Sequence, residues 1–170
     1  MNAYRVLSME EIMGKNNEIV NIDSPIKIQK MTEEHAAEVL EMMRVFYTSP
    51  AVHTNGSEEI FQNDIDACVG SNPFLDGYVF VEQEKLLGYA MTANSFSTEF
   101  GKPCIWIEDL YLKPEARGRG IGMQFLTELE KMQSGVLLRL EAEEENIPAV
   151  KLYKKVGFEV LPYLEMKKEV

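Results

Sequence analysis

Arg117-Gly118-Arg119-Gly120-Ile121-Gly122 is the stretch that determines how the rest of the chain is interpreted. It follows an apolar, β-type run over residues 104–112 and opens a helical pattern over 120–132. A strand, a glycine-rich turn and a helix N-terminus in that order form an anion site, because free N–H groups point outward and the helix dipole favours negative charge. Glycine lets a phosphate approach the backbone, and the two arginines add planar, charged donors. The sequence therefore predicts a ligand that carries a pyrophosphate.

Two common phosphate-binding loops do not match this stretch. It lacks the Gly-x-x-x-x-Gly-Lys-Ser/Thr pattern, which argues against a nucleotide triphosphatase. It also lacks Gly-x-Gly-x-x-Gly after an early strand with an acidic residue about 20 positions further on, which argues against a dinucleotide fold. A plain surface turn rich in glycine and arginine remains the alternative as long as the six residues are considered alone.

A second pattern lies downstream, where residues 146–159 read NIPAVKLYKKVGFE. They match Asn-x-x-Ala-x-x-Leu-Tyr-x-x-x-Gly-Phe, while residues 117–122 match Arg-x-x-Gly-x-Gly and residues 107–115 read IEDLYLKPE. In this order and spacing, the motifs resemble the acyl-coenzyme A loop and second signature of the GCN5-related N-acetyltransferase (GNAT) superfamily. The resemblance covers residues 26–168 and is distinctive over 104–159.

The resemblance implies acetyl-CoA as co-substrate. It also implies that backbone groups of Leu110 and Leu112 bind the pantetheine arm, while a neighbouring N–H polarises the thioester carbonyl. A β-bulge at this point would supply the unpaired groups. Asn146 caps its helix or hydrogen-bonds the cofactor, and the family pattern implies that one residue can do both. The expected cofactor-binding residues are Leu110, Tyr111, Leu112, Arg117, Gly118, Arg119, Gly120, Ile121, Gly122, Asn146 and Ala149.

Glu108 is the candidate general base. An alkylamine with a pKa of about 10.4 is charged at neutral pH and must lose a proton before it can attack a thioester. Burial beside Trp106 or Leu110 would raise the carboxyl pKa towards the working range. Asp109 is the alternative base, and a regular strand would put these two carboxyls on opposite faces. Glu108 acts directly or through water, or instead only binds the substrate cation or forms an ion pair.

Tyr153 is the candidate general acid. It occupies the Leu-Tyr position of the second motif, on the expected helix over 146–155. A phenol with a pKa near 10 can donate a proton to a departing thiolate. The alternative is a tyrosine that only packs in the core. Neither cysteine lies in the motif region with a base beside it, so the sequence favours direct transfer without an acyl-enzyme.

The order of expected elements is β-α-α-β-β-β-α-β-α-β-β. Strands are expected near 26–31, 77–83, 86–97, 104–112, 136–140, 158–161 and 163–168, and the first two helices begin at Thr32 and Ser57. This order predicts an α/β (α+β) fold of GNAT type, with a mixed, mostly antiparallel central sheet and helices on both faces. We expect residues 1–24 to form an N-terminal extension with a short helix from Ser8, and residues 25–170 to form a single acyl-CoA N-acyltransferase domain.

Composition narrows the possible partners. The net charge of −11 disfavours nucleic acid and anionic membranes. It either attracts cationic substrates or only keeps the protein soluble. No apolar run reaches about 18 residues, and no signal-peptide pattern opens the chain. Cys68 and Cys104 lack metal-ligand spacing with the two histidines, so no metal site is expected. Both cysteines are expected to be reduced thiols in a cytoplasmic protein.

The sequence predicts an N-acetyltransferase that moves an acetyl group directly to a primary amine of a small cationic molecule, such as a polyamine or amino sugar. One alternative is a protein or peptide N-acetyltransferase. Another is a non-catalytic acyl-CoA-sensing module, against which the presence of both Glu108 and Tyr153 argues. Dimers are common in the family, so a homodimer is also expected.

Overall fold

The computed structural model describes residues 18–19, 25–53, 56–133 and 135–168. Six strands form one sheet in the order β1-β2-β3-β4-β5-β6. All neighbours are antiparallel except β5 and β6, which are parallel, so the expected mixed, mostly antiparallel sheet is confirmed. The strands are β1 Glu18–Ile19, β2 Lys27–Lys30, β3 Leu75–Glu82, β4 Lys85–Ser97, β5 Lys102–Leu112 and β6 Leu137–Leu140.

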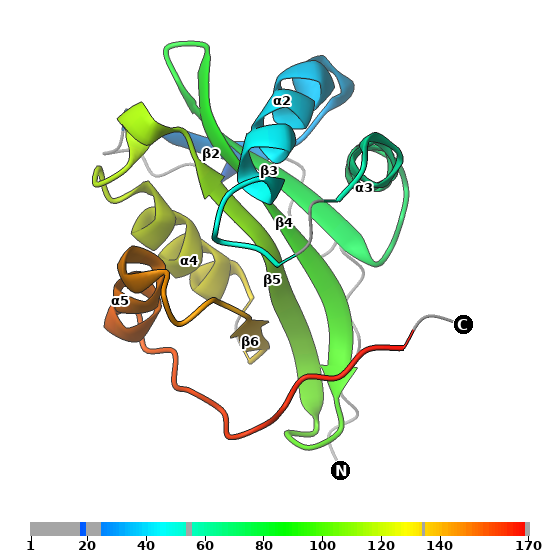
Figure 1. The fold of residues 1–170 in the computed structure, drawn as a ribbon, viewed down its shortest axis with the longest axis vertical. Coiled ribbons are helices and arrows are strands. Elements are labelled where there is room, and N and C mark those ends of the chain that lie inside the picture. The colour runs from blue at the N-terminus through cyan, green and yellow to red at the C-terminus, as the bar shows by residue number, and fades with distance from the viewer. Residues whose placement is uncertain (1–17, 20–24, 54–55, 134, 169–170) are drawn as a thin grey trace.

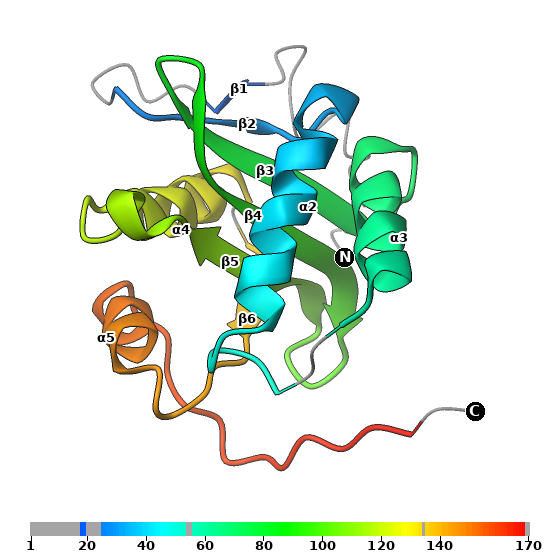
Figure 2. The same ribbon diagram turned by 45° about the horizontal axis from the view of Figure 1, so that its top comes forward.

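Helices cover both faces of this sheet (Figures 1 and 2). One face carries α2 and α3, and the other carries α4 and α5. The helices are α2 Ala36–Tyr47, α3 Glu58–Val69, α4 Ile121–Met132 and α5 Ile147–Lys155, with short 3-10 turns η1 Glu33–His35 and η2 Pro114–Ala116. The predicted fold class is therefore confirmed.

Strand alternation divides the buried side chains into two cores. One lies under α2 and α3, and the other, which we call the α4-side core, lies under α4 and α5. Tyr89 and Met91 of β4 pack under α2 and α3, whereas Ala90, between them, packs under α4. Fully buried Phe125 of α4 meets Phe80 of β3 with ring centroids 5.5 Å apart. Because the period of a strand is two, each central strand contributes to both cores and holds the layers in register.

The helices begin where local chemistry favours a start. The Ser57 hydroxyl accepts a hydrogen bond from the Ile60 N–H at 3.2 Å, as expected for a residue that caps α3. Thr32 forms a capping box with His35 at the start of η1. Pro148 lies in the first turn of α5, where its missing N–H costs no hydrogen bond.

The two closing strands predicted near 158–161 and 163–168 are wrong. Residues 158–168 contain no regular secondary structure, although apolar and polar residues alternate within them. Val160, Leu164 and Met166 are 82%, 91% and 90% exposed. A strand needs a neighbour to satisfy its backbone groups, and the described part of the chain provides none here.

The amino-terminal prediction lies mostly beyond what the structure describes. The short helix expected from Ser8 falls outside the described residues. Within the expected extension, Glu18–Ile19 pairs antiparallel with Ile28–Gln29 of β2. In the described segments, no helix is long and apolar enough to cross a membrane.

Candidate active site

A β-bulge lies in the strand that precedes the glycine-rich loop. Met91 of β4 pairs with Asp109, but the next residue, Thr92, pairs with Ile107. Glu108 is therefore the additional residue of β5, without a partner in β4. The bulge that would supply unpaired backbone groups is present next to the residues expected to contact the pantetheine arm.

On its other edge, β5 loses its pairing with β6 at the same residue, Glu108. Parallel pairing with β6 runs from Cys104 to Ile107, opposite Leu137 to Leu140, and ends there. From Glu108 to Leu112, no described strand pairs with β5 on the β6 side. The backbone groups of this edge are therefore available to a ligand that runs alongside the strand. We call this unpaired stretch of β5, residues 108–112, the open edge.

The start of α4 closes one end of this open edge. Gly118 and Gly120 have φ of 74° and 84°, and a Cβ at either position would meet nothing within 4 Å. The positive φ favours glycine. The first N–H groups of α4 have no intrahelical partners, and the space before them is open. The loop thus leaves open space beside unpaired N–H groups, and phosphate binding at this loop stays a prediction.

Both loop arginines already have partners. Arg117 Nε donates to the Leu112 carbonyl at 3.0 Å, which ties the loop to the end of β5. Arg119 forms an ion pair with Glu82 of β3, with Nη2 and Oε1 2.6 Å apart. Because both arginines are exposed, their remaining N–H donors can face a ligand. A phosphate at this loop would share Arg119 with Glu82.

Helix α5 reaches the same region from the other side of the open edge. A Cβ at Gly122 would lie 2.9 Å from Leu152 and 3.8 Å from Leu110. The missing side chain at Gly122 therefore lets α4, α5 and β5 meet closely. Ile121 is fully buried in the core, so only its backbone faces the loop.

Glu108 lies on an exposed part of β5, yet its pKa is raised above the ordinary value. Partial loss of water around the carboxyl is the main cause, followed by the negative charges of Glu165 and Asp64. Ile107, the preceding residue, faces the core under α4, so strand alternation directs the Glu108 side chain towards the α2–α3 side, where Asp64 lies on α3. A carboxyl with a raised pKa is a better acceptor of an amine proton than an ordinary one.

Asp109 is directed to the same side, which corrects the expected alternation. Its carboxylate accepts hydrogen bonds from Tyr47 at 3.1 Å and Tyr89 at 2.8 Å, and both phenols belong to the α2–α3 side. Two adjacent residues share a face here because the bulge interrupts the regular alternation. Burial raises the pKa of Asp109 to about 6, although the two phenols oppose this shift.

Tyr153 lies on the opposite side of the sheet. It packs against the α4-side core together with Leu110 and Leu152, and its ring contacts Phe158 with centroids 5.9 Å apart. Burial raises its phenol pKa, so the hydroxyl remains a proton donor at neutral pH. The candidate base and acid therefore approach the open edge from opposite faces.

The remaining predicted cofactor residues are placed as follows. Leu110 and Leu112 pack against the α4-side core, whereas Tyr111 is buried between them on the other face. Asn146 precedes α5, but its side chain makes no capping hydrogen bond, so the capping alternative is wrong. Ala149 lies in the first turn of α5 and is half-buried.

The sequence motifs did not predict several of the groups near the site. Tyr47 and Tyr89 bond Asp109 from 62 and 20 residues away, and no local signal relates them to it. Glu141 and Glu165 share a hydrogen bond, and the pKa of Glu141 rises to about 7, chiefly through desolvation and then through Glu165. His53 lies 2.8 Å from Glu143, so the loop after α2 meets the loop after β6.

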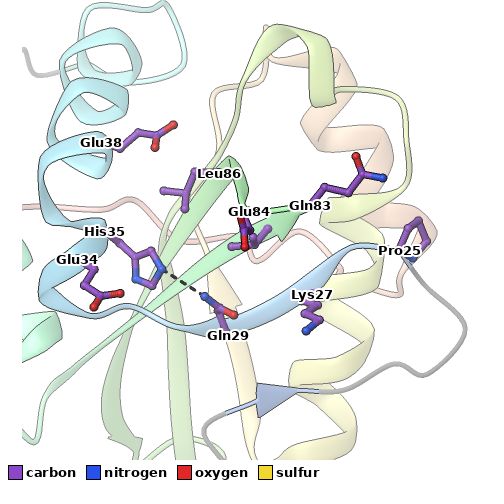
Figure 3. A pocket seen from close by; sticks show the side chains of 10 residues that line it. Pro25, Lys27, Gln29, Glu34, His35, Glu38, Gln83, Glu84 and Leu86 are labelled. Atoms are coloured by element: carbon purple, nitrogen blue, oxygen red, sulfur yellow. Dashed lines mark hydrogen bonds between the residues drawn. The ribbon is translucent and has the colours of Figure 1, made fainter.

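A cavity of about 540 Å³ lies elsewhere, between β2, the start of α2 and the β3–β4 turn (Figure 3). Two of the residues that line it are hydrogen-bonded to each other, with Gln29 Nε2 and His35 Nε2 3.2 Å apart. None of the predicted site residues lines it. The candidate active site is thus the open edge of β5 and the loop before α4, not this cavity.

Comparison with known proteins agrees with the motifs. The sequence model of the "Acetyltransferase (GNAT) family" matches residues 36–158. Thialysine N-epsilon-acetyltransferase of Bos taurus is 35% identical over 83 residues, which cover 47% of this chain and 48% of the bovine protein. The chain thus matches about half the length of that relative. The same enzyme of Sus scrofa is 28% identical over 145 residues, or 78% of this chain and 83% of the pig protein.

Solved structures share the fold. The aminoglycoside N-acetyltransferase AAC(6')-Iy in complex with CoA superimposes with a TM-score of 0.69 at 15% identity. The superposition covers 88% of this chain and 98% of that one. At this level of identity, the likeness extends to the fold alone.

Proposed function

This chain belongs to the acetyltransferase (GNAT) family, and we propose that it transfers the acetyl group of acetyl-CoA directly to a primary amine of a small cationic molecule. Acetyl-CoA supplies an activated acyl thioester. The glycine loop and the open edge of β5 suit a long ligand with phosphate at one end. This chain's residues then bind the cofactor, accept the amine proton and supply a proton to the thiolate.

Glu108 is the proposed base and Tyr153 the proposed acid. The amine nitrogen forms its bond to the acetyl carbon as the carbon–sulfur bond breaks. Glu108 takes the amine proton, directly or through one water, and Tyr153 gives its phenolic proton to the thiolate sulfur. Their positions on opposite faces of the sheet support this division, since the amine and the leaving thiol occupy different sides of the reacting carbon.

A direct reaction is supported by the state of the two thiols. Burial raises the pKa of Cys68 to about 12 and also raises that of buried Cys104. The thiolate is the nucleophilic form, so both cysteines are poor candidates for an acyl-enzyme. Reduced, free thiols also support the proposed cytoplasmic location.

The preference for a cationic acceptor rests on one arrangement: Glu108, Glu141 and Glu165, from distant parts of the chain, lie close enough beside the bulge to raise the pKa of Glu108 and of Glu141. Glu165 raises the pKa of Glu108 and of Glu141, and Glu108 contributes to the shift at Glu141. An arriving cation relieves this repulsion, whereas a neutral molecule does not. The relative of Sus scrofa is named for acetylation of thialysine, a small amine, which supports the same substrate class.

The first experiment measures release of the CoA thiol from acetyl-CoA with a panel of amines. The panel contains spermidine, an aminoglycoside, thialysine, free amino acids and a lysine peptide. Turnover with the small cations is the expected result. Turnover with the peptide alone would favour a protein acetyltransferase, and acetyl-CoA binding by calorimetry without any turnover would favour a sensing module. Absence of both binding and turnover would contradict the proposed site.

We also propose that residues 25–170 form a single catalytic domain that assembles as a homodimer through its C-terminal segment, residues 159–168. Leu164 and Met166 of this segment are exposed, and β6 is a sheet edge in the described chain. The apolar, alternating segment of one copy can pair with the unpaired edge of β6 in the other copy, and the reverse. Light scattering should show a dimer, and Leu164→Asp with Met166→Asp should produce a monomer. A wild-type monomer would contradict the assembly.

A further inference from the structure

We propose that Asp109 is a positioning residue: clamped by Tyr47 and Tyr89, it fixes the β-bulge that presents Glu108 to the acceptor. This role rests on the proposed acetyl transfer. The clamp joins three elements, because Tyr47 ends α2, Tyr89 lies on β4 and Asp109 lies on β5. The contacts are Tyr47 to Oδ1 at 3.1 Å and Tyr89 to Oδ2 at 2.8 Å.

The clamp exists only with the bulge in its observed place. Before the bulge, Ile105 and Ile107 face the α4-side core. After it, Leu110 and Leu112 face that core, so the alternation has shifted by one residue. A regular strand would turn Asp109 towards α4 and away from both phenols. The two hydrogen bonds and the bulge therefore stabilise each other.

Asp109 is not placed to exchange protons with a substrate itself. The residue is 3% exposed, and each carboxylate oxygen already accepts one phenolic hydrogen bond. Burial and the Asp109 charge raise the pKa of both phenols, so they remain donors at any pH of assay. Its neighbour Glu108 is exposed and has no partner in β4. One carboxyl therefore holds the backbone while the other meets the acceptor.

The clamp is kept at a cost in stability at neutral pH. The charged and titratable groups that act on Asp109 are Tyr47, Tyr89, Asp64, Glu108 and the Cys68 thiol. The pKa of Asp109 is about 6 in the folded chain, against an ordinary 3.8. Its protonated form thus favours folding below about pH 4, and this contribution is lost as the pH rises through about 6. Above that pH, the ionised side chain opposes folding, so a purely structural role would favour a neutral residue.

The test combines three substitutions with one control. Asp109→Asn keeps the shape and removes the charge, while Tyr47→Phe and Tyr89→Phe each remove one donor. We expect each to lower kcat on the order of tenfold to a hundredfold while the KM for acetyl-CoA changes by less than about twofold, because the reacting groups are misplaced and the loop before α4 is unchanged. The thermal midpoint of Asp109→Asn at pH 8 should equal or exceed that of the wild type.

Two further readouts separate positioning from general damage. In the tyrosine variants the acidic limb of the kcat profile should keep its position while its height falls, because Glu108 sets the limb and a positioning residue changes only how well the base is placed. Amide exchange at residues 107–110 should become faster in all three variants. Tyr78→Phe is the matched control: it removes a phenol that is also buried, but one that lies on the α4 side and whose hydroxyl is hydrogen-bonded with Thr92 and not with Asp109.

Unchanged kcat, or a loss no greater than in Tyr78→Phe, would overturn the positioning role. So would a fall in kcat that only follows a fall in thermal midpoint. If the wild type acetylates no amine in the panel, the proposed function fails, and amide exchange alone then decides on the clamp. Faster exchange at 107–110 in the variants supports the clamp, and unchanged exchange overturns it.

Discussion

Glu108 combines three properties that a residue seldom has together. It is the additional residue of the bulge, it is the first residue of β5 beyond the pairing with β6, and its pKa is raised. Each property follows from a different neighbour: β4, β6 and the acidic groups around the carboxyl. Their coincidence at one residue is what makes Glu108, rather than buried Asp109, the proposed base.

Glu108→Gln should lower kcat by about a hundredfold or more near neutral pH, since a base is lost. In the wild type, the base is lost as the pH falls through a pKa above 4.5, because the folded pKa is raised. The variant should lack this limb and recover partly at high pH, where more of the amine is deprotonated. Rate profiles from pH 5 to about 10 check this expectation.

Glu130→Gln is the control, because Glu130 is an exposed carboxylate on α4. It should leave the profile unchanged. A loss of equal size at every pH in Glu108→Gln would instead mean that Glu108 only binds the substrate cation.

Tyr153→Phe should lower kcat by about tenfold to a hundredfold with little change in KM for acetyl-CoA, because only the proton donor is removed. The deficit should shrink with an acetyl thioester whose thiol has a lower pKa, since such a thiolate leaves without a proton. Phe158→Leu is the control: it removes the ring contact of Tyr153 and keeps the phenol. Equal losses in the two variants would indicate that Tyr153 only packs.

At the scale of elements, the link between β5 and α4 is the proposed cofactor-binding element. A strand, the short turn η2 and two glycines with positive φ bring the first N–H groups of α4 to the end of the open edge. Gly122 then lets α5 pack closely beside α4 and β5. The two sequence motifs meet in space at this junction, which is why both are needed for one site.

Gly120→Ala should destabilise the fold by about 1–2 kcal/mol, because an L-residue is strained at φ of 84°. It should also weaken acetyl-CoA binding, because the new methyl group enters the open space before α4. Gly135→Ala is a matched control with the same φ of 84° and equally open surroundings beyond the other end of α4. Thermal melts should show similar losses for both, while calorimetry should show weaker binding for Gly120→Ala alone. Equal affinities would contradict a phosphate role for the loop.

At the scale of the whole molecule, the chain must bind an anionic cofactor despite a net charge of −11. The fold solves this problem by separation. Helix dipole, backbone N–H groups and two arginines collect at the start of α4, whereas Asp64, Glu108, Glu141 and Glu165 influence one another beside the bulge. One site can thus receive an anion and a cation at its two ends.

The overall charge gives a prediction for ionic strength. The KM of spermidine should rise several-fold as salt increases from about 0.05 to 0.3 M, because screening weakens attraction to the acidic groups. The KM of a primary amine that carries a single charge should rise less. Initial rates of thiol release under matched pH measure both. The same salt dependence for both amines would mean that the acidity serves only solubility.

Much of this protein could be predicted from short-range patterns. Glycines with positive φ, helix caps and strand alternation depend on neighbours along the chain, so the glycine loop, α3 after Ser57 and the alternating β2 were all predictable. The closing strands were not, because alternation in residues 158–168 indicates a segment able to pair and does not provide a partner.

The sequence by itself determined the family, the mixed sheet with helices on both faces and the position of the glycine-rich loop before α4, because each depends on local spacing. Only the tertiary structure decided the bulge at Glu108 and the clamp on Asp109. A bulge is a mismatch between two strands, and it places Asp109 between phenols that lie 20 and 62 residues away. Neither fact exists until β4, β5 and α2 are packed together.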